Sequence, residues 1–76
     1  MTTLTCPEEA GSDAVLALWC RRPGEAVHTG EVLAILEEED HLGTLVADID
    51  GVIDHLLVQG GEHVHADEPL ATVRES

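Results

Sequence analysis

Two stretches of the sequence repeat each other, and this repeat is the strongest constraint on the fold. Gly24-Glu25 and Gly61-Glu62 stand 37 positions apart, and the same offset relates further positions along both stretches. Other matched pairs include Val15 with Val52, Val27 with Val64, His28 with His65, Glu31 with Glu68, Leu33 with Leu70, and Ala34 with Ala71. A solenoid needs about three or more copies, so two copies predict two halves related by a pseudo-two-fold axis.

Short apolar runs rich in β-branched residues alternate with turn residues through both halves. We expect strands within residues 1–6, 14–20, 31–36, 42–49 and 52–58, and a last strand that ends near Val73. Pro23-Gly24, Asp50-Gly51 and Gly60-Gly61 indicate turns, and residues 7–13 indicate a loop. No segment combines helical periodicity with helical length, so the sequence predicts one all-β domain over residues 1–76.

Neither half can bury its apolar face alone, so we expect the halves to form a flattened β-barrel of two facing sheets. The aromatic content is 1%, a single Trp19, so the core must be mostly aliphatic. The expected core residues are Leu16, Trp19, Val27, Leu33, Leu36, Leu45, Ile49, Ile53, Leu56, Val64, Leu70 and Val73.

The charge is strongly negative. There are 16 acidic residues against three arginines, the formal net charge is −13, and the chain contains no lysine. Nucleic acids and anionic membranes are bound by clustered lysine and arginine, so both are disfavoured as partners. We expect a protein partner with a basic surface, or cations; a charge that only keeps a small domain soluble explains the composition equally well.

Two cysteines, Cys6 and Cys20, are too few for a disulfide framework or a four-ligand zinc site. Residues 1–11 show no signal-peptide pattern, and no apolar run approaches the roughly 20 residues of a membrane span. We therefore expect a cytoplasmic protein with free thiols. Cys20 is expected to be partly buried beside Trp19 and to act in packing rather than as a nucleophile.

An ordered set of residues resembles the lipoyl and biotinyl carrier domains. The set is Trp19, Gly24-Glu25, Val27, Gly30-Glu31, Leu33, Glu37, Gly51-Val52, Val58, Gly61-Glu62, Val64 and Leu70. The resemblance covers residues 7–73 and has features of both the lipoyl and the biotinyl branch. It implies a barrel-sandwich hybrid of two four-stranded antiparallel sheets. It also implies a swinging-arm carrier in which an exposed hairpin presents one lysine, joined by an amide to lipoate or biotin.

This sequence departs from the family at that hairpin. The resemblance places the attachment lysine at Asp40, within the run Glu37, Glu38, Glu39, Asp40 and His41, which we call the acidic tip. A ligase activates the carboxylate of the cofactor, and an uncharged amine must attack it. Asp40 offers no amine, and no shift of alignment supplies a lysine, so lysine-linked lipoylation or biotinylation is excluded for these residues. Gly43, where the family usually has an apolar residue, is expected to loosen the returning strand.

Metal sites are weaker interpretations of the same residues. The tip carboxylates could bind Ca²⁺ or Mg²⁺, but a linear run seldom converges on one ion. We expect mutual repulsion to raise the pKa values of these carboxyl groups. His63 and His65 are weak candidates for a Zn²⁺, Cu²⁺ or Ni²⁺ site, because two imidazoles need further ligands. His55 is expected on a strand face.

The function predicted from the sequence is that of a non-catalytic protein-interaction or regulatory module. It would work with a biotin- or lipoate-dependent multienzyme complex, contact its partner through the acidic tip and bind no cofactor. Two alternatives remain open. One is an accessory carrier subunit of a carboxylase or 2-oxo acid dehydrogenase with atypical or no cofactor loading. The other is a histidine-based metal-binding protein. A separate and still weaker interpretation takes His41 as a phosphoryl carrier, which is disfavoured because no basic groups flank it.

Overall fold

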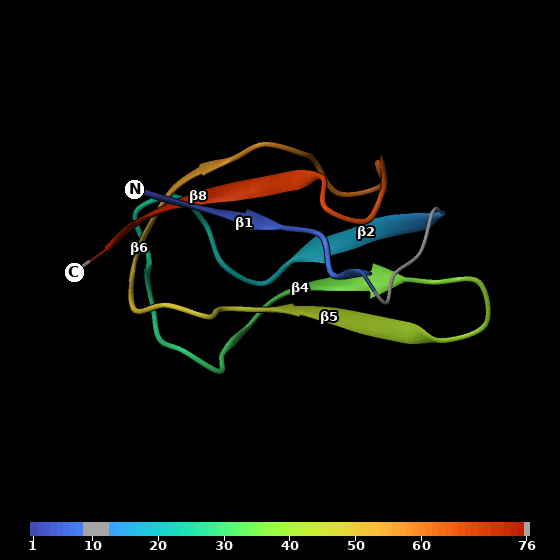
Figure 1. Cartoon of the computed structure of the whole chain (residues 1–76), viewed down its shortest axis with the longest axis horizontal. Helices are drawn as coiled ribbons and strands as arrows, with labels where there is room; N and C mark the ends of the chain where they lie inside the picture. Colours follow the sequence, from blue (N-terminus) through green and yellow to red (C-terminus); the bar gives the residue numbers. More distant parts are fainter. Residues whose placement is uncertain (9–12, 76) are drawn as a thin grey trace.

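The computed structural model describes residues 1–8 and 13–75, which form two facing four-stranded sheets (Figure 1). Sheet A has the strand order β1-β8-β6-β3, and sheet B has the order β5-β4-β2-β7. All pairings are antiparallel, which confirms the all-β flattened barrel predicted from the sequence. The strands are β1 (Thr2–Thr5), β2 (Ala14–Trp19), β3 (Ala26–Val27), β4 (Val32–Glu37), β5 (Leu42–Val46), β6 (Gly51–Leu56), β7 (His63–Val64) and β8 (Pro69–Glu75).

The predicted repeat is confirmed in three pairs of strands. An offset of 37 carries Ala14 of β2 to Gly51 of β6, and it likewise carries β3 to β7 and β4 to β8. The matched strands share the same order of buried and exposed residues. The matched glycines Gly24 and Gly61 have φ values of 91° and 93°, a backbone conformation that favours glycine.

Backbone hydrogen bonds tie each half to the other. The amide of Gly24 donates to the carbonyl of Ile53 at 2.8 Å, and the amide of Gly61 donates to the carbonyl of Leu16 at 2.7 Å. The turn of one half is therefore fastened to a strand of its twin, in both directions. This interlocking explains why two copies suffice for a closed core.

The core lies between the two sheets. Nine of the twelve predicted core residues are buried, whereas Trp19, Ile49 and Leu56 are only partly buried and pack against the core. The indole of Trp19 donates to the carbonyl of Val58 at 2.9 Å, which keeps its polar atom satisfied at the edge. Sequence reasoning missed these buried residues: Leu4, Cys6, Ala14, Ala34, Ala47, Val58 and Ala71.

The prediction for Cys20 is wrong. Strand β2 ends at Trp19, and Cys20 is exposed, with its amide donating to the carbonyl of Leu33 at 2.7 Å. The buried thiol is Cys6, whose pKa is raised chiefly by burial and further by the nearby carboxylates, first that of Glu68. Cys6 directly follows β1, where the buried residues Leu4 and Cys6 alternate with the exposed residues Thr3 and Thr5.

The turn predicted at Asp50-Gly51 lies slightly earlier, because the chain bends at residues 48–49 and Gly51 already belongs to β6. β5 belongs to sheet B and β6 to sheet A, so this segment carries the chain from one sheet to the other. Gly51 is the first residue of β6 and is buried. A Cβ on Gly51 would collide with the backbone carbonyl of Arg74, so close approach of two strands requires the glycine. Of the loop predicted at 7–13, residues 9–12 lie outside the described residues.

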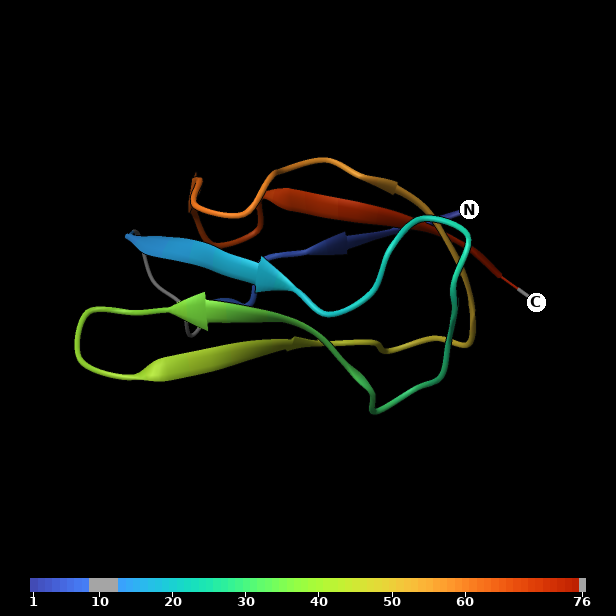
Figure 2. The ribbon, with the colours of Figure 1, turned by 180° about the vertical axis from the view of Figure 1, so that it is seen from behind.

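The hairpin between β4 and β5 lies at one end of the molecule, and both chain termini lie at the opposite end (Figure 1). Figure 2 shows the same arrangement from behind. β1 pairs with β8, and these two strands occupy the place in sheet A that β5 and β4 occupy in sheet B. In the described part of the chain, no helix is long and apolar enough to cross a membrane.

Candidate functional site: the acidic tip

The acidic tip forms a tight turn at the end of sheet B. The amide of Glu38 donates to the carbonyl of His41 at 2.9 Å, which joins the two arms of the hairpin across the bend at Glu39 and Asp40. The register of β4 and β5 continues up to the pair Glu37 and Leu42. The side chain of Asp40 is 87% exposed, so it is presented to the solvent at the apex.

Two carboxylates of the tip converge on one imidazole. Nδ1 of His41 lies 2.7 Å from Oδ1 of Asp40, and Nε2 lies 3.2 Å from Oε1 of Glu38. Because both ring nitrogens face a carboxylate, the doubly protonated imidazolium is favoured. The pKa of His41 is raised, first by its hydrogen bond to Asp40 and then by the charge of Glu38. We call this arrangement of Glu38, Asp40 and His41 the imidazole clamp.

The expectation that the tip carboxylates raise one another's pKa is wrong for Asp40. The pKa of Asp40 is lowered, chiefly by its hydrogen bond to His41. A row of carboxylates alone would raise these pKa values, but the imidazole of His41 lies among them and lowers that of Asp40. The clamp therefore offsets part of the repulsion that the run of acidic residues creates.

Gly43 has a different role from the one expected. Glu38 follows β4 with its side chain only 9% exposed, and its carboxylate occupies the space where a Cβ of Gly43 would lie. β5 remains paired with β4 at this point, with Gly43 opposite Leu36. The glycine thus makes room for the clamp, whereas sequence reasoning took it as a weak point in the strand.

The histidines predicted as metal candidates do not form a multi-ligand cluster in the described ranges. His63 and His65 flank Val64 of β7, and Nδ1 of His63 lies 3.3 Å from Oδ1 of Asp13. No group of three or more histidine, cysteine or acidic side chains gathers into a metal-holding arrangement within residues 1–8 and 13–75. His55 is exposed on β6, as expected, and lies 2.7 Å from the carboxylate of Asp54.

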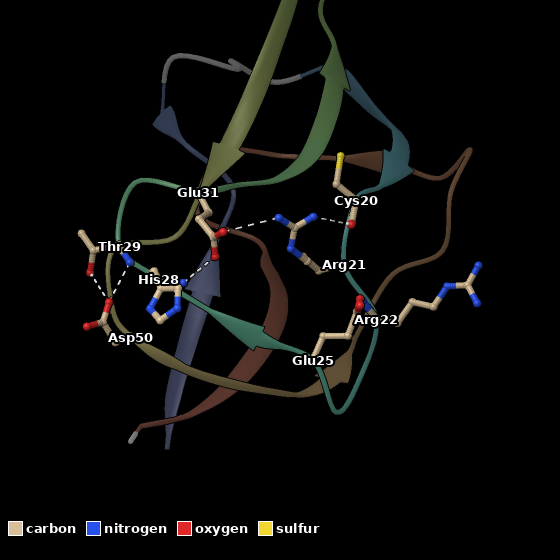
Figure 3. A network of polar contacts seen from close by, with 8 residues as sticks. All are labelled: Cys20, Arg21, Arg22, Glu25, His28, Thr29, Glu31 and Asp50. Atoms are coloured by element: carbon tan, nitrogen blue, oxygen red, sulfur yellow. Dashed lines mark hydrogen bonds and ion pairs between the residues drawn. The ribbon is translucent and has the colours of Figure 1, made fainter.

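Many of the remaining acidic residues act as caps of turns (Figure 3). Glu25 accepts the amide of Arg22 at 2.6 Å, and Glu31 accepts the amide of His28 at 2.7 Å. The repeat copies both caps, since Glu62 accepts the amide of Gln59 and Glu68 that of His65. These four glutamates form two of the acidic pairs that the repeat matches, so part of the negative charge serves the fold.

A second group of contacts joins the same region. Asp50 accepts the amide of Thr29 at 2.8 Å and its hydroxyl at 3.1 Å, and Arg21 reaches Glu31 at 3.4 Å (Figure 3). The pKa of Asp50 is lowered, first by the amide of Thr29, and that of Glu31 is lowered, first by the amide of His28. These partners are within the protein, so we assign this group to stability and leave the tip as the candidate site.

The tip does not fit an amide-linked lipoyl or biotinyl group. Its side chains supply carboxylates and one imidazole, and the 76 residues contain no lysine. The N-terminus lies at the end of the molecule opposite the tip (Figure 2). A stable amide of the family type needs an amine at the hairpin, and these residues provide none.

Comparison with known proteins finds related sequences and structures. The family described as "Biotin-requiring enzyme" (Biotin_lipoyl) matches residues 2–73. The dihydrolipoyllysine-residue succinyltransferase component of the 2-oxoglutarate dehydrogenase complex of Bacillus subtilis is 32% identical over 77 residues, which cover 99% of this chain and 18% of that protein. The biotin carboxyl carrier protein of acetyl-CoA carboxylase of Pseudomonas aeruginosa is 34% identical over 50 residues, covering 66% of this chain and 32% of that protein.

A solved structure agrees with the fold. The lipoyl domain of the 2-oxoglutarate dehydrogenase complex from Azotobacter vinelandii superposes with a TM-score of 0.80 at 28% identity, covering 100% of this chain and 99% of that domain. The chain therefore has the extent of one lipoyl domain, and it spans less than a third of the length of the curated relatives.

Proposed function

Because the chain belongs to the biotin/lipoyl family of carrier domains, we propose that it acts as a protein-interaction module of a multienzyme complex and carries no prosthetic group. The family carries lipoate or biotin covalently and is not itself catalytic. The domain would thus act in the same kind of complex as its relatives, but without a lipoyl or biotinyl group.

The chemistry of the tip supports this proposal most directly. Asp40 stands at the exposed apex of the hairpin, at the position that the resemblance gives to the attachment lysine. Its pKa is lowered by His41, so the group is a carboxylate at neutral pH. A carboxylate cannot form the amide by which a carrier holds its cofactor.

The tip is suited to docking against basic groups. Glu37, Glu39 and Asp40 are exposed at the hairpin, while the imidazole clamp fixes the shape of the turn. Arginine pairs with carboxylates through two parallel hydrogen bonds, so an arginine-bearing site would recognise this tip. The relatives are components of a 2-oxoglutarate dehydrogenase complex and of an acetyl-CoA carboxylase. We propose that the partner is a component of such a complex, at the site that receives a loaded carrier domain.

Neutralising the tip tests the proposal. The variant Glu38→Gln, Glu39→Gln, Asp40→Asn removes three charges from the tip, and the matched control Glu8→Gln, Asp48→Asn, Glu75→Gln removes three exposed charges elsewhere. Both proteins are tagged and isolated from the organism of origin at low and high salt. The tip variant should lose the dehydrogenase or carboxylase component and the control should keep it, with binding weakened by salt. Retention of every partner by the tip variant would rule out docking through the tip.

The family match also favours a second function, that of an accessory carrier subunit of a carboxylase or 2-oxo acid dehydrogenase. In that case the chain would be loaded through an unusual linkage, or would act beside a companion carrier. The mass of the isolated protein separates covalent loading from the proposal above. Co-isolation of a second, lysine-bearing carrier would identify the companion.

A further inference from the structure

The outer faces of the two sheets differ in chemistry, and we propose that the outer face of sheet B is a docking surface for a protein with an apolar centre and a rim of arginine and lysine. On sheet B, the cross-strand pairs Val32 with Val46 and Leu18 with Ile35 place aliphatic side chains side by side. Their exposed fractions are 52% for Leu18, 41% for Val46 and 37% for Val32. Leu42, 69% exposed, stands at the start of β5. We call these five residues the aliphatic face.

Sheet A provides an internal control for this surface. The repeat carries Leu18 to His55, Val32 to Pro69 and Ile35 to Thr72, and Thr5 faces Pro69 as Val46 faces Val32. The twin positions have closely similar backbone surroundings, yet hold histidine, proline and threonine. Exposed strand positions of this fold therefore do not require aliphatic side chains, so β-propensity alone does not explain those on sheet B.

The charge around the aliphatic face defines its occupant. Glu37 is paired with Val15 on one side and with Leu42 of the aliphatic face on the other. Beyond this row, β4 and β5 lead into the exposed carboxylates of the acidic tip. Arg21, near the end of β2, is paired with Glu31 at 3.4 Å. A second copy, itself with a net charge of −13, would bring like charges together, whereas a basic rim would be attracted.

The face and the tip are continuous, so this inference rests on the proposed function for its partner and adds a second contact surface. An apolar centre bordered by charges is the usual anatomy of a protein interface. The tip supplies the charged border at one end, and the aliphatic face supplies the area that is removed from water. Together they place the proposed interface on the side of the molecule formed by sheet B.

A photo-crosslinking amino acid at Thr44 tests the inference in the full-length protein, produced in its own host. Thr44 is exposed and lies opposite Ile35, and the matched control position is Thr3, which lies opposite Thr72 on sheet A. The crosslinked residues are mapped by mass spectrometry. The inference predicts a crosslink from Thr44, but not from Thr3, to an apolar surface bordered by lysine and arginine. A missing crosslink, equal crosslinks from both positions, or a crosslink to a second copy would overturn it.

Exchange variants separate the face from the tip. Leu18→His, Ile35→Thr and Val46→Thr give sheet B the residues of sheet A, and the control His55→Leu, Thr72→Ile and Thr5→Val makes the reverse change. The first variant should weaken the Thr44 crosslink by about tenfold or more, because central aliphatic contacts are lost, and the second should not. Unchanged crosslinking in the first variant, with the partner lost only on neutralising the tip, would overturn this inference and leave the proposed function standing. Loss of the partner in the first variant, with binding retained after neutralisation of the tip, would overturn docking through the tip and leave this inference standing.

Discussion

The carboxylate of Glu38 lies in the space that a side chain on residue 43 would fill, so Gly43 is required for the imidazole clamp. From this position Oε1 of Glu38 reaches Nε2 of His41 at 3.2 Å, while the other ring nitrogen faces Asp40. Two apparent departures of the sequence from the family, an acidic turn and a glycine in the returning strand, are thus parts of one arrangement.

Gly43→Ala should displace the Glu38 side chain and disturb the clamp with little cost to the fold. The obstacle is the end of a flexible side chain, so the free energy of unfolding should change by less than about 1 kcal/mol. The pKa of His41 should fall, because one of its two carboxylates moves away. NMR titration of His41 measures this, and Glu38→Gln should reproduce the direction of the fall. An unchanged His41 pKa in Gly43→Ala would show that Glu38 does not depend on the glycine.

Gly51→Ala should be far more harmful. Its Cβ would meet the carbonyl of Arg74, a backbone atom, and would lie 2.8 Å from Cγ1 of Val73. Overpacking against a fixed backbone should lower the free energy of unfolding by about 2 kcal/mol or more. Gly60→Ala is the control, because its nearest neighbour, the carbonyl of Ala17, is 3.4 Å from the new Cβ. Urea denaturation compares the two; equal effects would contradict the close approach of β6 and β8.

The clamp should depend on pH from both sides. The pKa of His41 is raised, so its contribution is complete below the ordinary value of 6.5 and is lost as the pH rises through the raised pKa. The pKa of Asp40 is lowered, so its contribution is present above the ordinary value of 3.8 and is lost as the pH falls through the lowered pKa. The clamp should therefore be fully formed at pH values between the lowered pKa of Asp40 and the raised pKa of His41.

Asp40→Asn should lower the pKa of His41, because the hydrogen bond to Asp40 is the largest cause of the rise. Asp54→Asn is the control, since Asp54 contacts His55 on sheet A and not the tip. The ring NMR shifts of His41, recorded at low salt in both variants, measure its pKa, which Asp54→Asn should leave unchanged. If Asp40→Asn left the titration of His41 unchanged, the clamp would not exist in solution.

The repeat made the fold predictable, because matched glycines and valines at one offset mark matched turns and core positions. Gly24 with Gly61 and Val27 with Val64 are found in equivalent places, as predicted. Buried alanines such as Ala34 were missed, since a small side chain gives no strong signal of burial. The exposure of Cys20 was missed because the hydrophobic pattern does not show that β2 ends one residue earlier, at Trp19.

At the tip, the sequence predicted an exposed acidic hairpin but not its internal contacts. The position of the Glu38 carboxylate depends on the space above Gly43, which is across the hairpin and two residues beyond His41. A linear sequence orders the carboxylates as neighbours and does not show which of them turn toward the imidazole. The signal that could have indicated it was the glycine itself, placed opposite a buried leucine.

Asp40→Lys should restore an acceptor for a lipoyl or biotinyl ligase. The change places an amine at the apex of the turn, where the resemblance puts the attachment lysine. We expect slow modification, because neighbouring carboxylates favour the charged amine over the reactive neutral form. Adding Glu38→Gln and Glu39→Gln should increase it. Mass increments after incubation with ligase, cofactor and ATP measure the reaction, with Thr44→Lys as a control; a complete lack of modification would show that the turn differs from that of a carrier.

This domain has the scaffold of a carrier, and we propose that it carries no lipoyl or biotinyl group. The most direct test is the intact mass of the protein purified from its own host, grown with biotin and lipoate available. We expect a mass equal to that of the unmodified polypeptide. A mass increased by one lipoyl or biotinyl group, located within residues 1–76, would contradict it.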